Sequence, residues 1–470
     1  MCVSRAVESS KQSGAALIAF LLIFVTAASF ALLKGLNEVA TKQHRDAQTA
    51  KALAEAKAAL IGRAAGANIV ENACTDECRR PGDLPCPDMN NDGSANDGSC
   101  NSQNRRLGRL PWRTLGLPDL RDGSGERLWY AVSSNFKNDN RTICGPSGVA
   151  GCLNSDSRGT ITVRNSNGGV LHYGDNPDKY VPSGAIAIVL APAGILQRQD
   201  AGTAQDRSCK TATTCNDPKN YLDIDVEKGQ DNADFADESP LDGFIQGDIF
   251  DASQNVIVND KILAITYEDI IPLLERRVAG EVLVCLRDYS ALPGNNARYP
   301  WAAKLADSAK GDFSDFNGER FGRLPDNPLD DTQGSGLNSA TWPTGDCKLP
   351  SSGTKWWLNW KEHMFYAVAE AYQPATVSPS LCGSSPNSCL TVNPPSPTPD
   401  RRAVVMVAGK KLAAVLPDIP IGQVRGDVSQ KGNITNYLEG KNADDLPNSF
   451  TSGPATATFN DVTCKNGNCL

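Results

Sequence analysis

The stretch from Ala15 to Leu33, AALIAFLLIFVTAASFALL, contains no charged residue. A run of about 19 mostly apolar residues is long enough to span a bilayer as an α-helix. The preceding leader carries Arg5 and Lys11, so the N-terminus is expected in the cytoplasm and the rest of the chain outside. The alternative is a cleaved secretory signal, whose apolar region is about 7–15 residues long and ends in small residues. The length of the run favours a membrane anchor.

The helical pattern continues beyond this run. Residues 37–66, NEVATKQHRDAQTAKALAEAKAALIGRAAG, contain no proline and are rich in the strong helix formers Ala, Lys, Glu, Gln and Leu. Gly62 and Gly66 indicate where the helix ends. One helix from Ala15 to Ala65 would be about 75 Å long. Helical spacing predicts a narrow apolar stripe made of Val39, Ala47, Ala50, Leu53, Ala54, Leu60 and Ile61.

A short basic leader that ends at Gly14, in the context KQSGAAL, precedes this helix. The combination resembles the N-terminus of type IV pilins and type II secretion pseudopilins. The resemblance implies that a prepilin peptidase cuts between Gly14 and Ala15, and that the helix packs against other pilin or pseudopilin subunits. The chain departs from the family in having Ala19 where a glutamate is usual and Ala15 where Phe or Met is usual. Some minor members share these departures, so a tip or initiating role fits better than a major subunit.

The composition of the remaining chain, about 400 residues, indicates loop-rich β-structure in more than one domain. The whole sequence contains 41 glycines, 29 prolines and only 6% aromatic residues. Its net charge of −8 argues against nucleic acid as a partner.

The chain has fifteen cysteines, of which Cys2 precedes the apolar run. There is no CxxC motif and none of the three histidines lies near a cysteine pair, so disulfides are favoured over a zinc site. An oxidising compartment and a membrane anchor together predict a single-pass protein of a bacterial inner membrane with its body in the periplasm. Cys74, Cys78, Cys86 and Cys100 cluster just after the helix, and close spacing predicts four disulfides among the others. Cys285 and Cys347 remain and would pair by elimination. The four close pairs are Cys144 and Cys152, Cys209 and Cys215, Cys382 and Cys389, and Cys464 and Cys469.

Five short segments recur in the same order in the two halves of the body. RRLGRLP matches ERFGRLP, GERLWYAV matches KEHMFYAV, AIAIVL matches AVVMV, NYL occurs twice, and ILAITYEDI parallels TATFNDV. An apolar helix expected near Ile271 takes the place of the Ala-rich helix in the second half. The predicted fold class is therefore α+β: a long transmembrane helix followed by a duplicated, disulfide-rich, pilin-like helix-plus-antiparallel-sheet body. The alternative is one irregular β domain. The expected divisions are a leader (1–14), the helix (15–66) and two units (67–270 and 271–470).

The segments LPCPD, LPWRTLGLP and YAV at Leu84–Asp88, Leu110–Pro118 and Tyr130–Val132 resemble a wider group of large prepilin-like proteins of Gram-negative bacteria. This second resemblance covers most of the chain. It supports a place in pilus or secretion machinery and implies no chemistry.

Asp88, Asn90 and Asp92 alternate in the segment DMNNDGSAND, with Gly93 at the sixth position. This is the opening of a calcium-binding loop, in which side-chain oxygens converge on the ion. The closing glutamate is absent, because the twelfth position is Ser99. The alternative is an Asx-rich turn held by Cys86 and Cys100.

No GxSxG, HExxH or phosphate-loop motif occurs in the chain, so we expect a non-enzymatic protein. The predicted function is a structural component, a minor pilin or pseudopilin with a low-copy tip position, of a type IV pilus or type II secretion-like apparatus. Its partners would be other pilin or pseudopilin subunits, the prepilin peptidase and the membrane. The alternatives are a membrane-anchored adhesin or ligand-binding protein that does not enter a fibre, and an exported hydrolase.

Overall fold

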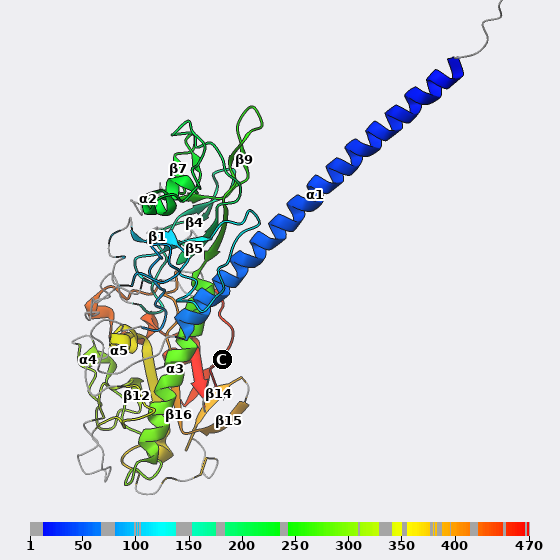
Figure 1. Cartoon of the computed structure of the whole chain (residues 1–470). Coiled ribbons are helices and arrows are strands. Elements are labelled where there is room, and N and C mark those ends of the chain that lie inside the picture. The colour runs from blue at the N-terminus through cyan, green and yellow to red at the C-terminus, as the bar shows by residue number, and fades with distance from the viewer. Residues whose placement is uncertain are drawn as a thin grey trace, which may run out of the picture.

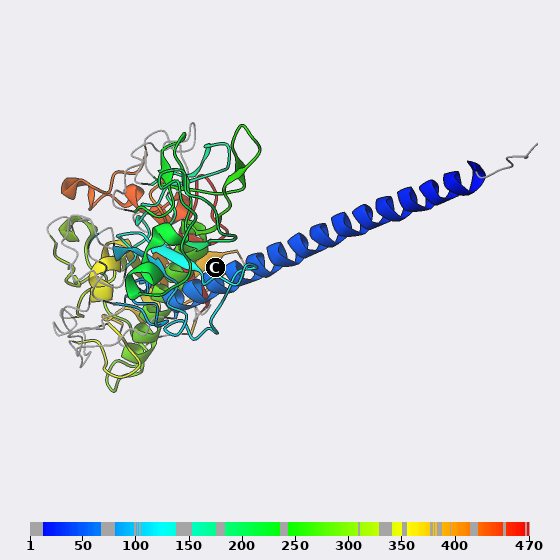
Figure 2. The same cartoon turned by 45° about the horizontal axis from the view of Figure 1, so that its top comes forward.

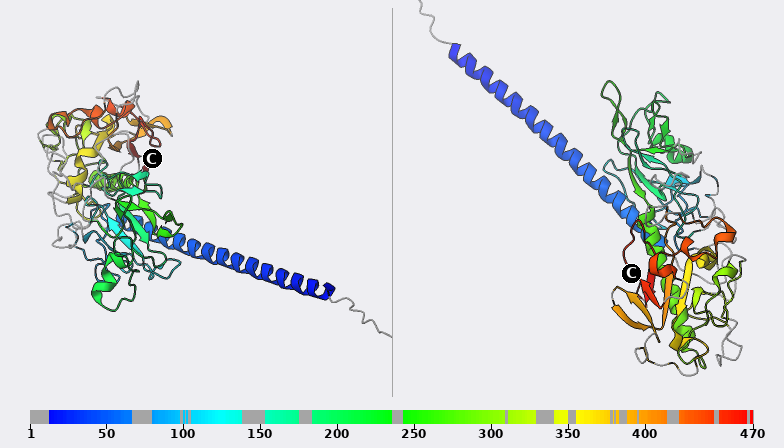
Figure 3. Two further views of the ribbon diagram at one scale, coloured as in Figure 1. Left: turned by 90° about the horizontal axis from the view of Figure 1, so that it is seen from above. Right: turned by 180° about the vertical axis from the view of Figure 1, so that it is seen from behind.

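The computed structural model describes most of the chain. The described residues are 13–66, 80–97, 100, 102, 105–137, 153–174, 184–235, 243–308, 311–328, 341–349, 355–376, 379, 381–382, 388–394, 396–413, 422–444, 448–465 and 468–469. Helix α1 (Ser13–Ala65) projects from a body of small sheets and loops, as all views agree (Figures 1, 2 and 3).

The prediction of a transmembrane helix is wrong. Within the parts of the chain that the structure describes, no helix is both long and apolar enough to cross a membrane. The described side chains of α1 from Val39 onward include Lys42, Arg45, Asp46 and Lys51, and these charges interrupt that part of the helix. The predicted location, a single-pass protein of the bacterial inner membrane with its body in the periplasm, is corrected accordingly.

The first large sheet lies against the C-terminal part of α1. Its antiparallel strands follow the order β1 (Leu107–Arg109), β2 (Trp129–Val132), β5 (Ala187–Ala191) and β11 (Lys261–Ile265). These strands are rich in aromatic and β-branched residues, which suit buried sheet positions. The recurring segments WYAV and AIAIVL therefore contribute the strands β2 and β5 of this sheet.

The second large sheet lies against helix α3 (Tyr267–Ala291). Its order is β12 (Phe321–Arg323), β13 (Met364–Val368), β16 (Ala403–Val407), β18 (Val462–Lys465) and β19 (Asn468–Cys469). Short strands form four further sheets: β3 (Val163–Arg164) with β4 (Val170–His172) and β8 (Phe244–Ile245); β6 (Ile224–Asp225) with β7 (Gln230–Asp231); β9 (Ile249–Phe250) with β10 (Val256–Val258); and β14 (Leu390–Asn393) with β15 (Ser396–Arg401) and β17 (Ser449–Thr451).

The remaining elements are short helices. The α-helices are α2 (Ala212–Asn216), α4 (Leu305–Ser308) and α5 (Lys355–Trp360). The described 3-10 helices are η2 (Pro218–Asn220), η4 (Lys361–His363), η5 (Glu370–Tyr372), η6 (Val428–Gln430), η7 (Ile434–Asn436) and η8 (Gly440–Ala443).

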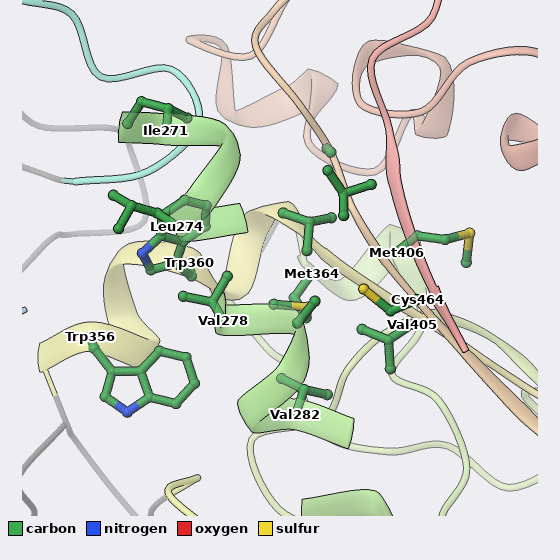
Figure 4. Packing of buried hydrophobic residues seen from close by; sticks show 14 of the residues in the cluster. Ile271, Leu274, Val278, Val282, Trp356, Trp360, Met364, Val405, Met406 and Cys464 are labelled. Carbon is green, nitrogen blue, oxygen red and sulfur yellow. The ribbon is translucent and has the colours of Figure 1, made fainter. Parts of the chain in front are cut away.

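The predicted fold class, with a duplicated pilin-like body, is also wrong. Within the described residues the strands form six sheets, and the largest hydrophobic cluster there runs without a break from α1 through α3 to the second sheet. In Figure 4, Leu274, Val278 and Val282 of α3 lie between Trp360 and Val405. Because both large sheets bury apolar faces in this one cluster, the body does not consist of two separate pilin-like units.

Helix α3 begins at Tyr267, four residues before the predicted start near Ile271. The capping residue is Thr266, whose backbone N donates to Asp269 Oδ2 at 2.8 Å and whose hydroxyl lies 3.1 Å from the same oxygen. This reciprocal arrangement fixes the first turn, so the helix accommodates Pro272 in its second turn.

Candidate functional site

The most exposed part of the molecule is the projecting segment of α1. The side chains described before Thr49, Phe24–Thr26 and Val39–Gln48, are all exposed. They include Phe24, which is 76% exposed, and Val39, which is 56% exposed. Large apolar side chains exposed at several points along a protruding helix indicate a surface that contacts another protein.

The body holds α1 from Arg45 onward. The loop before β2 passes so close that a side chain on Gly123 would overlap the backbone of Arg45. Gly123 N donates to Thr49 Oγ1 at 2.9 Å, and Gln48 Nε2 donates to Asp122 O at 3.0 Å. These contacts mark the point at which the helix leaves the body.

The buried face of α1 consists of Thr49, Ala52, Leu53, Ala56, Leu60 and Ala64. The predicted stripe is correct at Leu53 and Leu60, but Val39, Ala47, Ala50 and Ala54 are exposed. The predicted and observed stripes differ by about one residue, because alanines on two adjoining faces fit helical spacing equally well.

Two further ties fix the end of α1 to α3. Lys57 Nζ pairs with Asp269 Oδ2 at 2.7 Å and donates to Ala264 O at 2.9 Å. Arg277 of α3 donates to Ala65 O, the last carbonyl of α1. A cation at this end of a helix also interacts favourably with the helix dipole. The projecting segment is therefore attached to a rigid support rather than to a loop.

A cluster of ionisable groups lies where a loop of the first half, residues 153–157, meets the second half. The Asp156 carboxylate accepts hydrogen bonds from His363 Nε2 at 3.3 Å, Arg425 Nη1 at 3.2 Å and Lys411 N at 2.8 Å. The same loop is held by Tyr267, whose hydroxyl donates to Ser155 O at 2.9 Å. The three contacts of Asp156 join segments more than 200 residues apart in sequence.

The pKa values in this cluster diverge because the surroundings differ. Burial opposes ionisation of Asp156, but Arg425 and His363 outweigh it and hold the pKa of that carboxyl below its usual value. Burial lowers the pKa of His363, although Asp156 partly offsets this effect. Burial raises the pKa of Glu275, on the neighbouring helix α3, to about 8. At neutral pH the cluster therefore contains an ionised Asp156 and a protonated Glu275.

Diverging pKa values of this kind also occur in catalytic sites. Neutral His363 must carry its proton on Nε2 to donate to Asp156, which leaves Nδ1 as an acceptor. Nδ1 is buried and has no hydrogen-bond partner within the described part of the chain. An acid–base role would require a reacting group at this atom. The contacts present instead connect two parts of the chain, which we call the first region (residues before Tyr267) and the second region (residues from Tyr267 onward).

Two further polar networks have the same pattern of hydrogen bonds. We call Gln205, Arg207, Asp223, Asn232 and Asp260 the first polar cluster. Arg207 Nη2 donates to Gln205 Oε1 at 2.7 Å, and Gln205 Nε2 donates to Asp223 Oδ1 at 2.9 Å. Asp223 N and Asn232 Nδ2 both donate to Asp260 Oδ2 at 2.8 Å. The cluster ties the loop before β6 to the start of β11.

The second polar cluster consists of Gln423, Arg425, Glu439, Asn442 and Asp461. Arg425 Nη2 donates to Gln423 Oε1, and Gln423 Nε2 donates to Glu439 Oε1, both at 2.7 Å. Glu439 N and Asn442 Nδ2 both donate to Asp461 Oδ2 at 3.0 Å. This network ties the loop before η8 to the start of β18.

Sequence reasoning missed both clusters. A signal was available, because Gln-x-Arg precedes each NYL segment and Asn-Asp precedes each following strand. Burial and the neighbouring carboxyl group raise the pKa of both Asp260 and Asp461 well above the usual value. Buried hydrogen-bonded networks rigidify a fold, and here Asp260 Oδ1 and Asp461 Oδ1 are the carboxylate oxygens without a partner within the described residues.

The proposed calcium loop is an Asx-rich turn in this structure. Asp88 Oδ1 accepts from the backbone N of Asn90 and Asn91 at 3.1 and 2.7 Å, and Asp88 Oδ2 accepts from Gly93 N at 2.6 Å. Asn90 Nδ2 donates to Asp92 Oδ2 at 2.9 Å. The Cys86–Cys100 disulfide closes the loop. Within the described residues no group of three His, Cys, Asp or Glu side chains is placed to hold a metal ion, and calcium stays a prediction.

Three predicted cysteine pairs are bonded in the structure: Cys209 with Cys215, Cys285 with Cys347, and Cys382 with Cys389. Cys464 and Cys469 are partners in the register of β18 and β19, and the Cys469 side chain is outside the described part. Cys144 and Cys152 are outside the described residues.

The predicted cleavage point, Gly14 and Ala15, lies in the first turn of α1. The structure brings neither this point nor the Asx-rich turn together with the ionisable cluster at Asp156. The candidate site is thus the projecting helix, and the polar clusters form its rigid support. No family model, no curated protein and no solved structure matches this chain.

Proposed function

We propose that this protein is a non-enzymatic structural subunit of a filament of the type IV pilus or type II secretion pseudopilus class. Helix α1 would pack lengthwise against the equivalent helices of neighbouring subunits. The observation that carries the proposal is a 53-residue helix whose described side chains before Thr49 are all exposed.

The sequence of α1 supports packing against the equivalent helices of neighbouring subunits. A helix that is apolar on all sides is stable in water only when it is buried. Residues 15–33 contain no charged residue, so their sequence requires cover around the whole helix. Helices of the same kind supply this cover when they pack side by side.

The size of the body favours a low-copy position. More than 400 residues follow α1 in the sequence, and the body is much wider than the helix (Figure 2). Subunits repeated along a thin fibre would have to place such bodies side by side at every helix spacing, about 8–10 Å. A position at the tip avoids this crowding.

Photo-crosslinking in the host tests the packing of α1. Phe24→p-benzoylphenylalanine in the full chain should form an adduct with a neighbouring subunit. Leu381→p-benzoylphenylalanine is the matched control, because Leu381 and Phe24 are both 76% exposed. An adduct at the control position alone, or at neither position, would contradict the proposal.

The N-terminal residue tests the processing pathway separately. Mass spectrometry should find Ala15 as the first residue in a host with prepilin peptidase and Met1 in a host without it. An intact leader in both hosts would instead support the adhesin alternative. Equal abundance with the main subunit in sheared fibres would refute the tip position while leaving the packing of α1 intact.

A further inference from the structure

Two members of the second polar cluster, Gln423 and Glu439, line a surface cavity of about 780 Å³. The lining comes from residues 422–444, together with Thr458. This volume lies in the range of about 300–1,000 Å³ that is usual for small-molecule sites.

The floor is rigid. Gln423, Asn436 and Glu439 line the cavity, and each is less than 10% exposed. Asn436 Oδ1 accepts from Val424 N at 2.9 Å, and Glu439 Oε2 accepts from Asn460 N at 3.0 Å. Gln423 lies between Arg425 and Glu439, to both of which it is hydrogen-bonded. A ligand would therefore meet polar atoms whose positions are already fixed.

The rim offers hydrogen-bonding groups that are not used within the described part of the chain. Gln430 Nε2, Asn433 Nδ2 and Thr458 Oγ1 have no hydrogen-bond partner there. Asn433 keeps its orientation, because its Oδ1 accepts from Thr435 Oγ1 at 2.8 Å. The rim thus presents amide donors and a hydroxyl group at the mouth of the cavity.

The charge and the hydrogen-bonding groups of the lining favour one class of ligand. Among the described residues the lining contains no Lys or Arg, and its ionisable side chains there are Glu439 and Asp444, so anionic ligands are disfavoured. Amide and hydroxyl groups both donate and accept, which suits a ligand with many hydroxyl groups. Val424, which is 44% exposed, and Ala443 add apolar surface that suits the C–H face of a sugar ring. We propose that this cavity binds a neutral oligosaccharide.

A peptide is a weaker fit. Peptides that bind in extended form pair with the edge of a sheet, whereas this cavity is lined by loops and the turns of η6, η7 and η8.

The corresponding segment of the first region, between Arg207 and Tyr221, contains α2 and the Cys209–Cys215 disulfide in place of the 3-10 helices that line the cavity. The cavity therefore depends on residues particular to the second region.

The site is compatible with assembly through α1. Residues 422–444, orange in the figures, lie on the side of the body away from the free end of α1, on which the views in Figures 1, 2 and 3 agree. Packing of α1 against other helices would leave the cavity open. The inference does not depend on the proposed function, since a monomer would have the same cavity.

Isothermal titration of the full chain with maltotriose, cellotriose and triacetylchitotriose, each to about 10 mM, tests the proposal. We expect at least one to bind with a Kd near or below about 1 mM, and tri-galacturonic acid not to bind. The Gln430→Ala/Asn433→Ala variant should weaken binding by about tenfold.

Asn167→Ala is the matched control, because Asn167 is an exposed turn residue in the first region. It should leave the affinity unchanged. Thermal unfolding midpoints would verify that both variants are folded. Failure of all three neutral trisaccharides to bind, or full affinity in the double variant, would overturn the proposal. Binding of the neutral hexapeptide Gly-Asn-Ser-Thr-Asn-Gly in place of the sugars would identify a peptide site and overturn it as well.

Discussion

The two polar clusters share a chain of hydrogen bonds but differ in what their arginine reaches. Arg207 Nη1 donates to Ala193 O at 2.6 Å, and the nearest carboxylate beyond its cluster, Glu126, is in the same region at 3.8 Å. Arg425 Nη1 donates to Gly409 O at 2.7 Å and also to Asp156, which belongs to the other region. The second polar cluster thus forms a joint between the two regions through one additional carboxylate, whereas the first polar cluster connects segments within one region.

The comparison also shows how a buried charge is tolerated. Arg425 and Asp156 are nearly buried and partly buried, respectively, and each has several partners. Removal of one member of such a pair leaves the other uncompensated, which costs more than the net contribution of the pair. Substitution of Arg425 should therefore lower the free energy of unfolding more than substitution of Arg207 in the first polar cluster.

The largest expected effect is that of Arg425→Met. The variant leaves Asp156, Gln423 Oε1 and Gly409 O without their shared donor, so we expect a loss of about 5 kcal/mol in the free energy of unfolding. Arg207→Met should cost less, about 3 kcal/mol, because it leaves no carboxylate unpaired at hydrogen-bond distance. Urea unfolding of both variants measures the difference. Equal losses would show that Asp156 contributes nothing particular to the joint.

A pH series sharpens the comparison, because Glu275 adjoins the joint in the second region. Its pKa is raised from 4.5 to about 8, so the folded protein holds a proton that the unfolded chain releases. The stabilisation is complete below pH 4.5 and is lost as the pH rises toward 8. Between these values the wild-type protein should lose stability relative to Glu275→Gln, by about 3 kcal/mol at pH 7.

The matched control is Glu268→Gln, which changes an exposed residue in the first turn of the same helix. Unfolding midpoints from pH 5 to pH 9 should run parallel for this variant and the wild type. A Glu275→Gln curve that also runs parallel to the wild type would mean that Glu275 is ionised in the folded protein.

The sequence predicted local elements better than long-range contacts. Helix α1 was located to within two residues of its start, because a charge-free run and an Ala-rich run adjoin without proline. The strands at Trp129–Val132 and Met364–Val368 were found from β-branched and aromatic residues. The transmembrane assignment and the two pilin-like units failed, because hydropathy and short repeats do not reveal which faces share a core.

The candidate site likewise has one part that the sequence predicts and one part that it does not. The exposed helix follows from composition, whereas the contacts of Asp156 join residues 207 and 269 positions apart. No spacing rule links Asp156 to His363 or Arg425, since such contacts depend on tertiary packing. The recurring Gln-x-Arg and Asn-Asp pairs were visible in the sequence, but their meaning depended on the hydrogen bonds that connect them.

The smallest expected effect comes from a second pair of arginines that the two regions share. Arg109 lies over Trp129 and Tyr221, with its guanidinium carbon 4.3 and 3.9 Å from the ring centres. Arg323 lies in the same way over Phe365 and Tyr437, at 4.0 and 4.1 Å. Cation–π contacts of this geometry contribute about 2 kcal/mol when desolvated.

The two arginines differ in their hydrogen bonds. Arg109 donates to Arg127 O at 3.1 Å and Cys215 O at 3.3 Å, whereas Arg323 donates to Lys431 O at 3.1 Å. Arg323 Nε and Nη1 are buried without a hydrogen-bond partner within the described residues. Burial lowers the pKa of both guanidinium groups to about 10, so each is still charged at neutral pH and pays for desolvation.

Arg323→Met should therefore cost less than Arg109→Met, because an apolar side chain of similar length replaces a charge that is more poorly hydrogen-bonded. Arg109→Met should cost about 2 kcal/mol more, since two carbonyl groups lose their donor. Urea unfolding of the two variants at pH 7 measures the difference. Equal losses for the two variants would mean that stacking between two aromatic rings, rather than hydrogen bonding, stabilises the buried guanidinium, and that the two regions hold this charge by the same means.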